Sequence, residues 1–379
     1  MNILALNWQD LKNPLSGGAE VHLEELLRRL AAKGHRITLF CSNFKGGATE
    51  EVVEGIRIIR AGNRYNFNWI VPFYLRRLIR TGKYDLLLED INKIPFYSPL
   101  YQDLPTLVIV PHLFSTTVFS EINFVLGSYI YVSEMFLAPV YRKKRFCVIS
   151  ESTADDMAKR GIPRGNVTVI HCGIDSGLYN NDKKYEKFEQ PTALYLGRIK
   201  KYKSIQDLIT AFRLVRQKAP ESRLAIVGTG DYLPQLKALA HDTHVADAVE
   251  FPGFVSAEKK VEYLCRAHVM VYPSLKEGWG LTNIEANGCG TAVVAANTPG
   301  LRDSVKDGYS GVLYEYGNIE QLAQKILLVL RDENLQTRLS RESIDWAHTF
   351  SWDSSADAMM RLLEKTVEGA LSNRKQRGY

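Results

Sequence analysis

The stretch HVMVYPSLKEGWGLTNIEANGCG, residues 268–290, contains the pattern that decides the fold. Its first five residues form an apolar run typical of a buried strand, and a Gly-Trp-Gly turn then leads into a helix-like segment. A strand that feeds a helix through a glycine-rich turn presents free backbone N–H groups, which suit a phosphate. Glu277 and Glu285 lie around this turn and could accept hydrogen bonds from hydroxyl groups, or they could be ordinary solvated glutamates.

The same strand-to-helix pattern recurs along the chain in two series. Apolar runs of the first series lie at 3–6, 37–40, 86–89, 106–110, 146–149 and 167–170, and those of the second lie at 193–196, 223–227, 249–251, 268–272 and 292–295. Amphipathic segments between the runs predict parallel βαβ units. Because 379 residues exceed the size of a single growing core, we expect an α/β protein with two facing Rossmann-like domains.

Domain boundaries follow from composition. A polar stretch at 180–190, rich in Asn, Lys and Glu, is interpreted as a linker. We therefore expect an N-terminal domain at 1–175, a C-terminal domain at 191–350, and a final amphipathic helix with a basic tail at 351–379. Ligands of open α/β sheets bind at the carboxyl ends of the strands, so the two domains are expected to share a ligand there.

Composition limits the class of protein. A hydrophobic fraction of 45% with 24% charged residues is typical of a soluble globular chain. The N-terminal residues MNILALNWQD predict a first strand rather than a signal peptide. Five scattered cysteines argue against a disulfide framework and a zinc site and favour a cytoplasmic location. The net charge of +6 suits anionic partners such as sugar nucleotides, lipid phosphates or membrane headgroups. We expect no nucleic-acid partner.

Two cations follow the strand at 193–196. Arg198, directly after Gly197, and Lys203 lie five positions apart at a strand-to-helix junction, where both could contact one diphosphate. If that diphosphate were a leaving group, the cations would neutralise the charge that grows on it. The alternative is a pair of unrelated surface cations.

Other residues at predicted strand ends are weaker candidates. Gly17 and Gly18 precede the first helix but lack the complete G-x-G-x-x-G dinucleotide pattern. His112 could contact a sugar hydroxyl or could be a structural histidine. A second group of residues follows two strands of the second series and consists of Gly228, Gly230, Phe254 and Val255. These residues could lie near a phosphate or a base, or they could form ordinary turns.

No metal or organic cofactor is expected. The sequence contains no Asp-x-Asp pair and no His, Cys or Asp cluster with metal-ligand spacing. It also lacks a nucleophile elbow and a Walker lysine loop. Arg198 and Lys203 would therefore take the place of a metal at a diphosphate.

Taken together, the segments SGGAE, GRIKKYKS, GTG, FPGFV and the Glu277-to-Glu285 element resemble the retaining glycosyltransferases of family 4, which have the GT-B fold. The resemblance covers essentially the whole chain. It implies a nucleoside-diphosphate sugar donor, with Glu277 on the sugar hydroxyls and Glu285 on the ribose. It also implies that Arg198 and Lys203 hold the diphosphate and that the last helix returns to the N-terminal domain.

The resemblance assigns further contacts. His112 would reach toward the transferred sugar, and the Phe254-Val255 region would border the base. Backbone groups near the phosphates would come from Gly17, Gly18, Gly278, Trp279, Gly280 and Leu281. Two departures from the family pattern are Ser204, where glycine often follows the lysine, and Leu113, where an aspartate often follows the histidine.

These implications predict transfer of a hexosyl unit to a hydroxyl acceptor with retention, by front-face attack, in polysaccharide, glycolipid or envelope glycan biosynthesis. The acceptor would be a glycan or a lipid-linked glycan. Residues 65–80, YNFNWIVPFYLRRLIR, and 124–145 combine aromatic and basic residues, which suits either peripheral contact at the inner face of a membrane or buried helices. A GT-B-fold epimerase and a non-catalytic sugar-nucleotide-binding protein remain alternatives.

Overall fold

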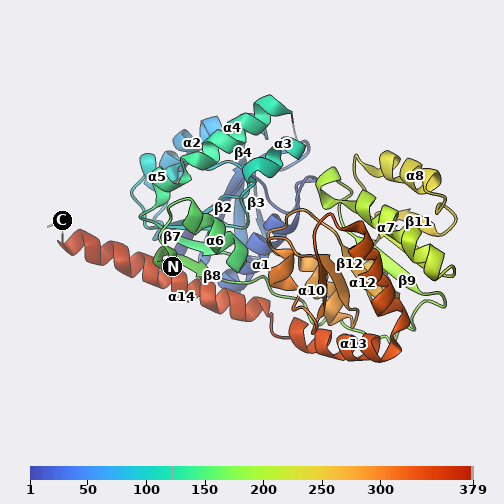
Figure 1. Ribbon diagram of the computed structural model, residues 1–379. Coiled ribbons are helices and arrows are strands. Elements are labelled where there is room, and N and C mark those ends of the chain that lie inside the picture. The colour runs from blue at the N-terminus through green and yellow to red at the C-terminus, as the bar shows by residue number, and fades with distance from the viewer. Residues whose placement is uncertain (122, 377–379) are drawn as a thin grey trace. The chain divides into compact units, whose positions relative to one another are not determined.

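The structure is a computed structural model that describes residues 1–121 and 123–376, and the chain folds into two compact units (Figure 1). Unit 1 consists of Met1–Gly173 together with the C-terminal segment that begins at Trp352. Unit 2 is Ile174–Ser351. Each unit contains a mainly parallel sheet with helices packed against it, as expected for two Rossmann-like domains.

The sheet of unit 1 has eight strands in the order β3-β4-β2-β1-β5-β6-β7-β8. Its strands are β1 (Asn2–Leu6), β2 (Arg36–Ser42), β3 (Glu50–Val53), β4 (Ile56–Ala61), β5 (Leu86–Asp90), β6 (Thr106–Val110), β7 (Arg145–Val148) and β8 (Val167–Val169). All neighbouring pairs are parallel except β3 and β4. The six strands predicted in this unit are present with small shifts at their ends.

The hairpin β3-β4 was not predicted. Glu54 and Gly55 form its turn with φ of 48° and 81°, the left-handed region that both central residues of a type I′ turn require. A short apolar run on each side of Glu-Gly is the signal that could have identified it. The hairpin adds an antiparallel edge to an otherwise parallel sheet.

Helices cover both faces of this sheet. One face is covered by α1 (Gly18–Ala32) and α14 (Trp352–Gln376), and the other by α2 (Phe67–Thr81), α5 (Leu137–Tyr141) and α6 (Glu151–Lys159). Helix α4 (Phe124–Met135) leads directly into α5. Shorter helices are η1 (Ser98–Leu100), η2 (Ser115–Thr117), α3 (Val118–Glu121) and η3 (Arg164–Asn166).

The predicted return of the last helix to the N-terminal domain is confirmed. Buried residues of α14 recur at helical spacing, and Ala356, Met359 and Leu363 join the same core as Leu26 and Leu30 of α1. An ion pair between Arg29 Nε and Asp353 Oδ1, 2.7 Å apart, lies at the edge of this contact. A segment from the end of the chain thus completes the core of unit 1 (Figure 1).

The sheet of unit 2 has six parallel strands in the order β11-β10-β9-β12-β13-β14. They are β9 (Thr192–Leu196), β10 (Arg223–Val227), β11 (Val249–Gly253), β12 (Val269–Tyr272), β13 (Val293–Ala296) and β14 (Gly311–Tyr314). The helices are η4 (Lys201–Lys203), α7 (Ile205–Lys218), α8 (Leu233–Asp242), α9 (Ala257–Arg266), α10 (Leu281–Gly288), α11 (Leu301–Ser304), α12 (Ile319–Arg331) and α13 (Glu333–Ala347). Only β14 was not predicted.

The polar stretch at 180–190, interpreted from composition as a linker, packs within unit 2. The N–H of Phe188 donates to the carbonyl of Arg266, and Lys187 Nζ donates to the carbonyl of Ala267 at 2.7 Å. The Phe188 ring also lies 4.5 Å from the Arg266 guanidinium. Composition could not reveal these contacts because they join residues about 80 positions apart in the sequence.

The contact between α14 and α1 predicts a selective loss of stability. Leu363→Ala leaves a cavity in the core of unit 1 and should lower the free energy of unfolding by about 2–5 kcal/mol. Leu371→Ala is the matched control, because Leu371 lies on the same helix and is 52% exposed. Urea unfolding followed by circular dichroism measures both changes. Equal losses in the two variants would contradict the packing described here.

Buried His22 predicts a pH dependence. Burial lowers the pKa of His22 to about 4, so in acid the unfolded state binds a proton that the folded state excludes. Stability should therefore fall as the pH drops from about 6.5 toward 4, by about 3 kcal/mol for this group. His22→Leu should remove that part of the slope, measured by urea unfolding at pH 7 and pH 4. His241→Leu, at an exposed histidine, should leave the slope unchanged.

Candidate active site

A buried ion pair lies at the carboxyl edge of the sheet in unit 2. Lys203, at the end of η4, places Nζ 2.5 Å from Oε1 of Glu277, and the two side chains are only 8% and 14% exposed. Ser274 Oγ donates to the same carboxylate oxygen at 2.5 Å, and the Tyr272 hydroxyl lies 3.5 Å from Nζ. Two of the predicted residues, from separate loops, are thus brought into direct contact.

Lys203 remains a cation in this environment. Burial by itself would lower the pKa of Lys203, but the negative charge of Glu277 outweighs burial and holds the pKa well above its ordinary value. The ammonium also lies 4.9 Å from the centre of the Tyr202 ring and 5.4 Å from that of Tyr272. Tyr272 and Tyr202 are site residues that the sequence did not reveal.

The glycines of the GTG turn hold the loop that follows β9. Ile199 N–H donates to the Thr229 carbonyl at 2.9 Å. A Cβ on Gly228 would lie 1.9 Å from the carbonyl oxygen of Gly197, and one on Gly230 would lie 1.8 Å from that of Ile199. These positions need glycine because two backbones touch. The structure thus gives the predicted phosphate-turn glycines a supporting function beneath the loop of Arg198.

The turn after β12 is fixed by similar backbone contacts. Glu277 N–H donates to the carbonyl of Pro299 at 3.1 Å, and Gly280 begins α10 with φ of 91°. Trp279 is buried, and its ring meets that of Phe350 edge-on at 5.2 Å. The Trp279 side chain therefore belongs to the core, which leaves only its backbone to meet a ligand.

Glu285 lies one turn inside α10 and is ion-paired. Its carboxylate is 2.7 Å from Lys260 Nζ of α9, and the same ammonium donates to the Tyr179 hydroxyl at 2.9 Å. Neither partner was predicted, because neither lies near Glu285 in the sequence. A ribose hydroxyl at this carboxylate would share it with Lys260.

The remaining predicted residues of unit 2 lie at strand ends with varied exposure. Arg198 is exposed after β9, Phe254 is 85% exposed after β11, and Val255 is half-buried. Arg198 follows the carboxyl end of β9, and Phe254 and Val255 follow that of β11, with β10 between these two parallel strands. The carboxyl edge of this sheet therefore carries both cations and both carboxylates of the predicted donor site.

The structure shows how serine is accommodated at position 204, where the family pattern often has glycine. Ser204 adopts a left-handed φ of 53°, the conformation in which glycine is usually found. Its hydroxyl lies 3.0 Å from that of Tyr316. We infer that this hydrogen bond compensates for the strain of a non-glycine residue beside Lys203.

In unit 1, Gly17 and Gly18 begin α1, where Gly17 N–H donates to Glu20 Oε2 at 2.7 Å. His112 follows β6 and is half-buried, with its ring centre 5.0 Å from that of Phe114. Both sites lie after carboxyl ends of strands within this unit. That the two sheets share a ligand stays a prediction.

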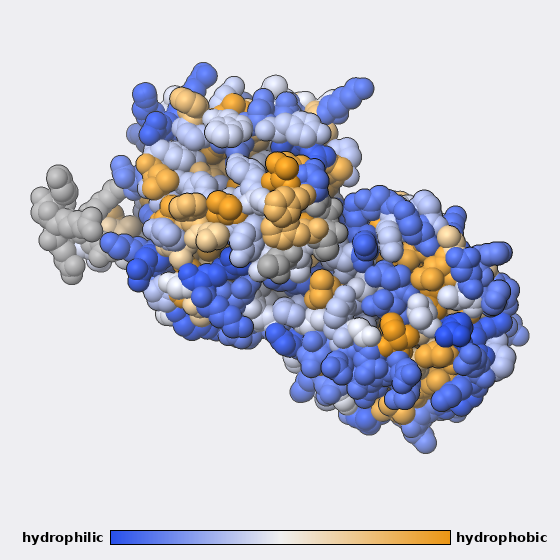
Figure 2. All heavy atoms as spheres, turned by 45° about the horizontal axis from the view of Figure 1, so that its top comes forward, coloured by the Kyte–Doolittle hydropathy of each residue, from blue (hydrophilic) through white to orange (hydrophobic). Residues whose placement is uncertain are grey.

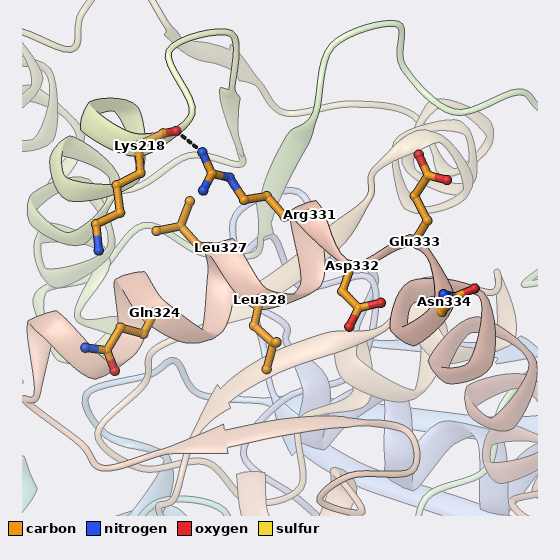
Figure 3. Close-up of a pocket in the computed structure, with 8 residues that line it drawn as sticks. All are labelled: Lys218, Gln324, Leu327, Leu328, Arg331, Asp332, Glu333 and Asn334. Carbon is orange, nitrogen blue, oxygen red and sulfur yellow. Dashed lines mark hydrogen bonds between the residues drawn. The ribbon is translucent and has the colours of Figure 1, made fainter.

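A surface pocket of about 670 Å³ lies elsewhere on unit 2 (Figure 3). Lys218 and Arg331, at the ends of α7 and α12, line it, and Arg331 donates to the Lys218 carbonyl. None of the predicted site residues lines this pocket. Among residues 1–121 and 123–376, no group of three or more His, Cys, Asp or Glu is arranged to hold a metal ion.

Comparison with known proteins identifies the chain. Residues 180–346 match the family "Glycosyl transferases group 1", and residues 16–178 match "Glycosyltransferase Family 4". Sucrose-phosphate synthase from Thermosynechococcus elongatus is similar in structure, with a TM-score of 0.82 at 20% identity over 97% of this chain and 100% of that one. HepE from Anabaena, solved with UDP and glucose, has a TM-score of 0.75 at 18% identity over 96% and 100%.

Relatives that are similar in sequence are also glycosyltransferases. A GDP-mannose-dependent phosphatidylinositol monomannoside mannosyltransferase of Mycobacterium tuberculosis is 25% identical over 90% of this chain and 93% of its own. D-inositol 3-phosphate glycosyltransferase of Mycolicibacterium smegmatis is 34% identical over 52% of this chain and 47% of its own.

The fold thus places the protein in the GT-B class. The chain belongs to the group 1 glycosyltransferases of family 4. It is a retaining enzyme of sugar transfer in glycan biosynthesis, as the sequence predicted, and no relative named above supports the epimerase or binding-protein alternative.

The close approach beneath the Arg198 loop is testable. Gly230→Ala forces a methyl group against the Ile199 carbonyl and should lower the stability of unit 2 by about 1–3 kcal/mol. Gly165→Ala is the matched control, because its methyl group would meet open space. Thermal unfolding by calorimetry compares the two variants. A Gly230→Ala protein as stable as Gly165→Ala would contradict the described contact.

Proposed function

We propose that this enzyme transfers a hexosyl unit from a nucleoside-diphosphate sugar to a hydroxyl group of a glycan or lipid-linked acceptor. The observation that carries the proposal is the buried Lys203–Glu277 pair beside exposed Arg198 at one carboxyl edge. Cations suit a diphosphate, and a carboxylate suits sugar hydroxyls. The solved relative that holds UDP and glucose supports a donor of this class.

The proposed step is front-face attack with retention. The acceptor oxygen bonds to the anomeric carbon while the bond from that carbon to the diphosphate oxygen breaks. The acceptor proton passes to the departing phosphate oxygen. No separate enzymatic base or metal ion is needed, because the leaving diphosphate accepts the proton and the protein cations neutralise its charge.

The two cations lie in different surroundings. Lys203 is paired with Glu277, so the two together carry no net charge, and Arg198 would bring a second cation to the leaving group. Lys203 would fix the position of Glu277 and donate to a phosphate oxygen as the donor arrives. Glu277 Oε1 already accepts from Lys203 and Ser274, which leaves Oε2 as the oxygen proposed for a sugar hydroxyl.

The other proposed contacts follow the family pattern. Glu285, supported by Lys260, would accept from the ribose, and the backbone of 278–281 would contact the phosphates. Phe254 and Val255 would border the base. From unit 1, Gly17 and Gly18 would approach the phosphates and His112 the transferred sugar.

A cytoplasmic location at the inner face of a membrane is proposed for the whole enzyme. All five cysteines are buried free thiols, which agrees with a reducing compartment. A mannosyltransferase relative acts, by its name, on a phosphatidylinositol mannoside, which supports a lipid-linked acceptor.

Donor binding is the first experiment. Thermal unfolding with UDP-, GDP- and ADP-sugars should reveal one donor class that raises the melting temperature, because a ligand that binds only the folded state stabilises it. That donor is then incubated without acceptor. Its conversion to another sugar nucleotide would favour the epimerase alternative, and stabilisation by none of the three classes would contradict the proposed donor.

Arg198→Ala should reduce kcat/KM for transfer by about 100-fold or more, because the charge on the leaving diphosphate would lose one of its two proposed counter-charges. The side chain is exposed, so the melting temperature should not change. Lys201→Ala, at an exposed cation of the same loop, is the matched control and should retain near-normal transfer. Initial rates of nucleotide release measure both. Equal losses of activity in the two variants would contradict the specific role of Arg198, because they would show that any positive charge on this loop has the same effect.

A further inference from the structure

Unit 1 exposes a set of large apolar side chains that its own core does not use. Trp69 and Phe73, one turn apart on α2, are 72% and 73% exposed, and Phe124 and Val125 at the start of α4 are each 76% exposed. The set, here called the apolar surface, consists of Trp69, Phe73, Leu100, Phe124, Val125, Val132, Met135 and Phe136. Figure 2 shows apolar atoms gathered over the part of unit 1 that contains these helices.

The contributing elements lie on the same face of the sheet. Arg76 Nε of α2 donates to the carbonyl of Tyr101, and the Tyr97 hydroxyl donates to the carbonyl of Ser133 in α4. The segment between these two contacts contains Leu100, which is 69% exposed. Helix α2, this segment and helix α4 are therefore connected neighbours, and their exposed residues form one surface.

The charges around the apolar surface have one sign. Exposed basic residues lie within the second half of α2 and directly after α5. They are Arg76, Arg77, Arg80, Arg142 and Lys143. Within α2, α4 and α5 the single acidic residue is Glu134, which is buried. Aromatic side chains flanked by arginines, with no exposed carboxylate on these helices, match a layer of anionic lipid headgroups over acyl chains.

We propose that the apolar surface of unit 1 docks on an anionic lipid bilayer, with α2 and α4 lying in the plane of the interface. Trp69, Phe73 and Phe124 would enter the boundary between headgroups and acyl chains. The arginines of α2 would contact lipid phosphates.

The structure favours lying on the bilayer over crossing it. The segment Phe124–Tyr141 is long and apolar enough to span a membrane, and only 28% of it is buried, unlike a core helix. However, its inner side is held by unit 1, because Tyr141 is fully buried and donates to Glu89 at 2.5 Å. Glu134 is also paired with Arg160 at 3.3 Å. A segment fixed along one side to a folded unit can present only its other side to lipid.

Helix α4 also holds the loop that carries His112. The two carboxylate oxygens of Glu134 accept from the N–H groups of Phe114 and Ser115 at 2.7 and 2.9 Å. Docking through α4 would therefore place this loop close to the interface, where a lipid-linked acceptor presents its sugar. This last step rests on the proposed function, whereas lipid binding does not.

Vesicle co-sedimentation of the full chain tests the proposal. The protein should pellet with vesicles of equal parts phosphatidylcholine and phosphatidylglycerol at low salt, much less with phosphatidylcholine alone, and less as salt is raised. Trp69→Ser with Phe73→Ser should weaken this partitioning by about tenfold or more. Arg77→Gln with Arg80→Gln should weaken it by about 30-fold.

Matched controls separate the surface from general effects. Val52→Ser removes an equally exposed apolar residue elsewhere on unit 1, and Arg213→Gln with Arg341→Gln removes two exposed charges from unit 2. Both control proteins should bind vesicles like the unmodified protein. Equal weakening in controls and test variants, or no preference for the anionic vesicles, would overturn the proposal.

Two further readouts make the outcome unambiguous. Light scattering tests whether a second copy of the chain covers the apolar surface instead of lipid. A dimer of the unmodified protein that the Trp69 and Phe73 substitutions dissociate would overturn the lipid proposal. Donor-induced stabilisation should be unchanged in all variants. Donor binding without vesicle binding would refute the docking surface alone, and vesicle binding without donor binding or transfer would refute the proposed function alone.

Discussion

The ion pair between Lys203 and Glu277 is the interaction on which the proposed chemistry depends. Burying two charges is favourable only if their geometry and additional hydrogen bonds repay the loss of water. Here Ser274 and Tyr272 provide those contacts, and the loops that carry the pair are tied by backbone bonds to neighbouring strands. The pair is therefore held in place by its surroundings, and Gly228 and Gly230 allow the close backbone contacts beneath the loop after β9.

Much of the fold could be predicted because hydrophobic periodicity is local information. Eleven apolar runs were found as strands, and the amphipathic pattern of α14 was recognised with its return to unit 1. The β3-β4 hairpin and β14 were missed because β3 and β14 have only four residues each and arginines interrupt the apolar residues of β4. The stretch at 180–190 looked like a linker because its packing uses backbone groups and a cation over a ring.

The site could be predicted only as far as its residues are near one another in sequence or follow a family pattern. Lys203 and Glu277 were each selected from their positions at strand ends, but their direct ion pair was not predicted and is a finding of the structure. The pairing of Glu285 with Lys260 and Tyr179 depends on tertiary packing between α9, α10 and residues before β9, which no local pattern encodes. Burial of Trp279 likewise involves Phe350, which is 71 positions away (350 − 279).

The placement of α14 has a consequence for biosynthesis. A ribosome releases the chain from its N-terminus, and domains generally fold as they emerge. Unit 2 is one continuous segment and can close once Ser351 has left the exit tunnel, whereas the core of unit 1 lacks Met359 and Leu363 until these residues have followed unit 2 out of the tunnel. The half of the protein made first is thus the half completed last, and its exposed α1 stripe is what a chaperone would meet in the interval.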